Sequence, residues 1–102
     1  MDAEPPRLAI NIPDEFKRGA YSDVVMVWHN QFGFTLDFLA QLQPELVAAA
    51  DGDPALPFEV VARVRIPPSV IFLLMKALNE NLTRYEQTFG PIPDPGQQKG
   101  QP

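Results

Sequence analysis

The stretch IFLLMKALNENLTRYEQTF, residues 71–89, carries the strongest structural signal in the sequence. Its apolar residues recur at intervals of four and three: Ile71, Met75, Leu78, Leu82, Tyr85 and Phe89. This spacing keeps side chains on one face of an α-helix, and it is the spacing of one helix lying along another. Pro68 suits the first helical position, because its missing N–H would be unpaired there. Gly90 and Pro91 then end the predicted helix after Phe89.

This helix carries more apolar surface than one face of a sheet can cover. Val70, Leu73, Leu74 and Ala77 form a second face beside the first. Each large apolar side chain left in water forfeits roughly 1.5–3 kcal/mol. The sequence therefore predicts a homo-oligomer, a dimer or larger. The candidate interface residues are Val70, Leu73, Leu74, Ala77, Leu78, Leu82 and Tyr85. The alternative is an apolar helix packed only along its own sheet, since the stripe spans fewer heptads than a coiled coil needs.

Four strands are expected before the helix: residues 8–12, 20–29, 32–41 and 58–66. The third alternates most regularly between apolar and other residues, as a half-buried strand does. The second, 20–29, is apolar on both faces and is therefore expected at the centre of the sheet. Strands grouped before a helix favour an α+β fold, here an antiparallel sheet of about four strands followed by one long C-terminal helix.

The connecting segments give weaker signals. PDEFKRG, residues 13–19, reads as a turn or one helical turn closed by Gly19. Asn30 and Gln31 are expected to form a hairpin turn between the second and third strands. Pro44 could open a short helix to Ala50 inside the connector 43–57, whose structure the sequence leaves open.

Length and composition limit the function classes. The 102 residues predict a flexible N-terminus (1–6), one α+β domain (7–90) and a disordered tail rich in proline, glycine and glutamine (91–102). A net charge of −5 disfavours nucleic acid and anionic membranes as partners. The absence of cysteine excludes disulfides, zinc–thiolate sites and thiol catalysis. With no signal-peptide pattern and no long apolar stretch, a cytoplasmic location without a membrane span is expected.

Few residues could carry chemistry. His29 is the only histidine, so neither a multi-histidine metal site nor a catalytic triad is expected. Asp37 and Arg63 each lie inside an apolar strand, and a structural ion pair between them is predicted, with a polar ligand patch as the alternative. Gly33 is expected at a hairpin or bulge, because no phosphate-binding loop surrounds it. We therefore expect no catalytic residues, no metal and no cofactor.

Four segments in this order carry a family resemblance: INIPDEFKRGAYSDVVMVWH, FTLDF, VVARVRIPPSV and ALNENLTRYEQTFG. Together they resemble a small bacterial family known only as a domain of unknown function, over roughly residues 8–92. The resemblance implies a compact cytoplasmic α+β protein, and it implies no reaction. Two departures are visible. Pro67 stands where such proteins tend to place a hydroxyl N-cap, and the connector 43–57 is longer and richer in alanine.

The sequence thus predicts a non-enzymatic interaction or assembly protein that self-associates, with room for an unidentified protein partner. The alternative is a chaperone-like peptide binder, similar in outline to the export chaperone SecB, which is also acidic and oligomeric with a sheet followed by a long helix. That alternative rests on likeness of fold alone.

Overall fold

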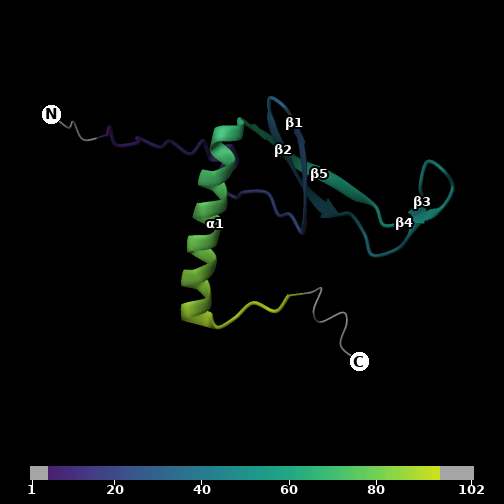
Figure 1. Ribbon diagram of the computed structural model, residues 1–102. Helices are drawn as coiled ribbons and strands as arrows, with labels where there is room; N and C mark the ends of the chain where they lie inside the picture. The colour runs from purple at the N-terminus through teal and green to yellow at the C-terminus, as the bar shows by residue number, and fades with distance from the viewer. Residues whose placement is uncertain (1–4, 95–102) are drawn as a thin grey trace. The chain divides into compact units, whose positions relative to one another are not determined.

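The computed structural model describes residues 5–94 (Figure 1). In chain order the elements are the 3-10 helix η1 (Asp14–Phe16), the strands β1 (Val24–Asn30), β2 (Gly33–Gln41), β3 (Val47–Ala48), β4 (Pro54–Ala55) and β5 (Phe58–Ile66), and the helix α1 (Pro68–Phe89). Chain contacts divide the described residues into two compact units. One joins the residues up to Met26 with Leu36–Val64, and the other joins Val27–Thr35 with the residues from Arg65 onward.

The main sheet is antiparallel and has the strand order β1-β2-β5. At one end of the β1–β2 hairpin the rings of His29 and Phe34 lie 6.0 Å apart, and beyond the other end the Asp23 N–H donates to the Leu39 carbonyl at 3.0 Å. Just after β2 ends, the Leu42 N–H donates to the carbonyl of Pro57, the residue before β5, at 2.9 Å. The central strand is β2, which is also the least exposed.

The prediction that the strand 20–29 is central was wrong. The structure begins this strand at Val24 and places it at an edge of the sheet, with all seven of its residues exposed. Two apolar faces require cover above and below a strand. They do not require a hydrogen-bonded neighbour on both sides, so the pattern does not fix a position within the sheet.

The count of about four strands in one sheet also needs correction. Residues 8–12 form no strand, and Leu8 and Ile10 are 84% and 78% exposed. Alternation over so few residues is a weak signal, and Pro6 and Pro13, which cannot donate to a ladder, flank the segment. The main sheet therefore has three strands. The two short strands β3 and β4 form a second, separate sheet.

The connector forms this second sheet in place of a short helix from Pro44. Val47 pairs with Ala55 and Ala48 with Pro54 in an antiparallel ladder. The turn between them contains Gly52 at φ +91°, a backbone conformation that glycine adopts without steric cost. A short alanine-rich segment does not hold a helix by itself, whereas an Asp-Gly pair favours a hairpin.

The single helical turn before Gly19 is confirmed as η1, and the predicted long helix is confirmed at both bounds. Helix α1 starts without a side-chain cap, as expected from Pro67, and the Val70 N–H donates to the Pro67 carbonyl at 3.0 Å. It ends at Gly90, which has φ +92° and donates its N–H to the Glu86 carbonyl. Among the helices of residues 5–94, none has an apolar stretch of the length that a membrane span requires.

Candidate functional site

The structure brings Asp37 and Arg63 together across neighbouring strands β2 and β5. Arg63 Nε donates to Asp37 Oδ1 at 2.6 Å, and Arg63 Nη2 donates to Oδ2 at 2.9 Å. The two bonds form a bidentate pair, the geometry in which a guanidinium fits a carboxylate best. Asp37 is the one buried residue of the described chain, and its side chain is 5% exposed, against 62% for Arg63. The exposed Arg63 guanidinium therefore supplies hydrogen bonds and a compensating charge to the buried Asp37 carboxylate.

Asp37 raises the pKa of Arg63 above its ordinary value, first by hydrogen bonding and then by charge attraction. A raised pKa keeps the guanidinium protonated, so the contribution of Arg63 to folding is fully present below the pKa of free arginine. It would be lost only in strong alkali. Arg63 therefore remains a charged partner of Asp37 throughout the physiological pH range.

Metal-ligating side chains do not cluster in the described part of the chain. No group of three histidine, cysteine or acidic side chains there could hold a metal ion. His29 lies near the end of β1, exposed, with its ring against Phe34. The two rings are tilted by 40° to each other, and a single exposed imidazole in such a contact is typical of a surface side chain.

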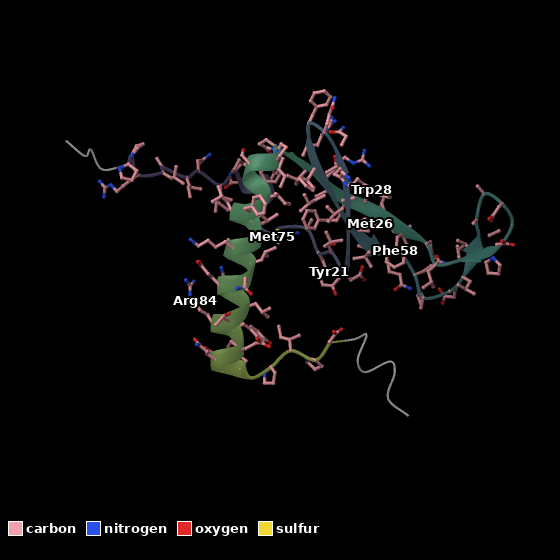
Figure 2. The ribbon with its side chains drawn as sticks, in the orientation of Figure 1. Tyr21, Met26, Trp28, Phe58, Met75 and Arg84 are labelled. Atoms are coloured by element: carbon pink, nitrogen blue, oxygen red, sulfur yellow. The ribbon has the colours of Figure 1, made fainter. Side chains whose placement is uncertain are left out.

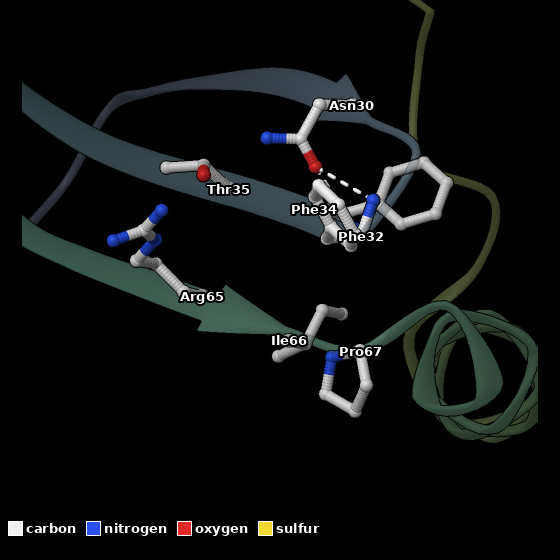
Figure 3. Close-up of a pocket in the computed structure, with 8 residues that line it drawn as sticks. Asn30, Phe32, Phe34, Thr35, Arg65, Ile66 and Pro67 are labelled. Carbon is white, nitrogen blue, oxygen red and sulfur yellow. Dashed lines mark hydrogen bonds between the residues drawn. The ribbon is translucent and has the colours of Figure 1, made fainter.

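A hollow of about 300 Å³ lies beside the β1–β2 turn (Figure 3). It is lined by Asn30, Phe32, Gly33, Phe34, Thr35, Arg65, Ile66 and Pro67. Asn30 Oδ1 accepts hydrogen bonds from the N–H groups of Phe32 (2.8 Å) and Gly33 (3.1 Å). The turn thus comprises Gln31 and Phe32, one residue later than predicted, and the Asn30 side chain closes it. The Asn30 side-chain oxygen is therefore occupied within the turn. Among the residues that line the hollow, Arg65 is the one that carries a charge.

Gly33 is required at this turn by a close approach of backbone. A Cβ atom there would lie 2.5 Å from the carbonyl oxygen of Ile66, closer than real side chains come. The sequence indicated a hairpin or bulge at Gly33, and the structure gives the physical reason as contact with the end of β5.

Large apolar side chains are exposed on both β1 and α1, among them Trp28 and Met75 (Figure 2). None of the apolar residues that the structure describes is buried. On β1, Met26 and Trp28 are 41% and 51% exposed, and on α1 the exposure of Leu73 reaches 65%. Large apolar patches of this kind mark surfaces that another molecule covers. The candidate functional surfaces are therefore two, considered separately: the exposed apolar residues of β1 and those of α1.

The predicted interface residues of α1 differ in exposure. Val70 and Leu74 are half-buried in the first two turns. The others are exposed along the length of the helix: Leu73, Ala77, Leu78, Leu82 and Tyr85. The exposed surface of β1 was missed as a candidate. Its signal, a strand apolar on both faces, is present in the sequence, where it favours association as well as a central position, but no residue of the strand is among the predicted interface residues.

The chain belongs to the family described as protein of unknown function DUF3467, whose model matches residues 2–94. The family resemblance seen in the sequence is thereby confirmed. Neither among curated proteins nor among solved structures does any significantly similar protein occur.

Proposed function

We propose that the protein is a non-enzymatic assembly protein that acts as a homo-oligomer. The observation that carries the proposal is that the described chain buries no apolar residue, although its sequence is 45% hydrophobic. Folding is driven mainly by removing apolar surface from water. A chain that leaves this surface exposed completes its core by association.

The apolar residues are distributed in a way that favours burial by a second chain and not burial by other parts of the same chain. Along β1, Val24, Met26 and Trp28 share one face of the strand, while Val25 and Val27 share the other, and all five are exposed. One helix can cover only one face of a sheet. The described residues contain no second α-helix, and a second chain would supply cover for the other face.

Urea unfolding at several protein concentrations tests this proposal. In an oligomer, folding includes association, so the unfolding midpoint rises with protein concentration. A hundredfold increase in concentration adds about 2.7 kcal/mol to the apparent stability of a dimer. Trp28, the only tryptophan, provides the fluorescence signal. A midpoint that stays the same at every concentration would contradict the proposal.

The alternative is a chaperone-like peptide binder similar in outline to SecB. The exposure of Phe32 (77%) and Phe72 (74%) favours it, because such rings could hold apolar segments of an unfolded chain. The two functions differ in what remains exposed after assembly. An unfolded, fluorescently labelled polypeptide should bind to the assembled protein only if the chaperone reading is right. The absence of cysteine favours the reducing cytoplasm as the place of action in either case.

A further inference from the structure

The main sheet has two edge strands, and they differ in how well they are protected. β5 carries Glu59, Arg63 and Arg65, and Pro57 and Pro67 stand immediately before and after it. Charged side chains and prolines are the usual means by which proteins prevent an edge strand from pairing with another chain. The β5 edge is therefore protected against association.

β1 has none of these protections between Val24 and Asn30. Its sequence VVMVWHN contains no charged residue at neutral pH and no proline, and all seven residues are exposed. Its valines and its tryptophan favour strands, and seven residues span about 23 Å. A long, flat, apolar edge strand is a template for pairing with another strand, and natural proteins do not leave one uncovered.

We propose that β1 pairs antiparallel with β1 of a second copy, about a two-fold axis at Met26, to form a continuous six-stranded sheet. In this register Met26 lies opposite Met26 of the second copy, Val25 lies opposite Val27, and Val24 lies opposite Trp28. The whole apolar run 24–28 is then matched with itself, and His29 and Asn30 lie beyond it. The inference rests on the proposed self-association and specifies the surface through which it occurs.

A second copy fits this edge better than an unrelated strand for two reasons. A two-fold axis pairs the same segment on both chains, so the run VVMVW meets a partner of equal length and polarity with no like charges opposed. Pairing also uses up both β1 edges. The combined sheet then ends in two β5 strands, which are protected, so growth stops at a dimer across this sheet and no fibre forms.

Single cysteines test the register, because the sequence contains none of its own. The variant Met26→Cys places a thiol at the two-fold axis, where it meets its own copy within disulfide range. The matched control is Val64→Cys on the protected edge β5, at a position 44% exposed against 41% for Met26. Both variants would be oxidised with a mild oxidant and followed on non-reducing gels. Circular dichroism and light scattering would verify that the reduced forms fold and associate like the wild type.

Met26→Cys is expected to form a covalent dimer roughly tenfold faster than Val64→Cys, because disulfides require Cα atoms within about 7 Å. If Met26→Cys fails to fold, a mixture of Val25→Cys and Val27→Cys replaces it, and cross-linking between the two different chains is expected. Equal rates at both edges, or a faster rate at Val64, would overturn the inference. Cross-linking at neither edge in a protein that light scattering shows to be oligomeric would overturn the β1 pairing and leave the proposed function standing. A monomer would overturn both.

Discussion

Asp37 has a carboxylate in the middle of the central strand, where apolar residues would be expected. Burying a charge is costly unless it is paired and hydrogen-bonded, and the Arg63 guanidinium supplies two bonds from the next strand. The pair also links β2 to β5 in a defined register, because a shift of one residue would turn Arg63 to the other face of the sheet. We expect its role to be structural.

The first prediction concerns this pair. Asp37→Asn should lower the free energy of unfolding by about 1–3 kcal/mol, since a charge-assisted bidentate contact is lost at a buried position. Arg63→Lys should also destabilise, because a lysine ammonium cannot make both bonds. The control is Arg65→Lys on the same strand, which should change stability little. Urea unfolding at one fixed protein concentration measures all three, and a loss at Arg65 equal to that at Arg63 would contradict the assigned role.

The second prediction concerns Gly33. Glycine within a strand ordinarily costs stability, so alanine at an open position would stabilise by about 0.5–1 kcal/mol. Gly33→Ala should instead destabilise by about 1–3 kcal/mol, because the new methyl group would press on the Ile66 carbonyl. Thr35→Ala, two residues along the same strand, serves as the control for loss of strand propensity. Thermal unfolding followed by circular dichroism gives the sign, and a stabilised Gly33→Ala variant would disprove the close approach.

Among the elements, α1 is the one most fully specified by the local sequence. Its first turn follows from Pro68 and its end from Gly90, and the heptad spacing sets its apolar stripe. It lacks charged residues that would favour either terminus, with no acid in the first turn and no base in the last. Its stability therefore depends on what packs against its apolar faces, as for most helices in proteins.

The third prediction distinguishes these faces by placing glutamate at Leu73 and, separately, at Leu82. On the face that packs within the subunit the charge should unfold the protein, because a buried unpaired charge is costly. On the face between copies it should leave a folded protein that associates more weakly and has a lower mass, since each buried leucine contributes about 1.5–3 kcal/mol. Asn79→Glu, at an exposed polar position of the same helix, is the control. Light scattering with circular dichroism separates the two results, and a native oligomer from both leucine variants would refute the role of the helix.

At the scale of the whole molecule, the sequence predicted what depends on neighbours in the chain. Helix α1, strand β5 and the turn before Gly19 all follow from local spacing and from proline or glycine at their ends. The order of strands could not be predicted. The apolar residues at 24–28 show that both faces of the strand need to be buried, but they do not show which neighbouring strands form hydrogen bonds with it. The hairpin formed by β3 and β4 depends on a pairing between two-residue strands, which alanine-rich residues signal poorly.

The candidate site residues were likewise predictable only where the signal lay in the local sequence. The pairing of Asp37 with Arg63 could be anticipated, because two opposite charges in apolar strands need partners. The two apolar faces of β1 could be seen in the sequence, but its edge position could not, because a strand that is buried by a second chain has the same composition as one buried within its own sheet. Only the strand order β1-β2-β5 distinguishes them, and that order depends on contacts between residues far apart in the sequence.

The most direct test of the account is the mass of the wild-type protein in solution, measured by light scattering after size-exclusion chromatography at tens of micromolar. A chain of 11.4 kDa that completes its core by association should elute at a mass of two or more chains, with the circular dichroism of a folded α+β protein. A folded, cooperatively melting protein with the mass of one chain at that concentration would contradict the account.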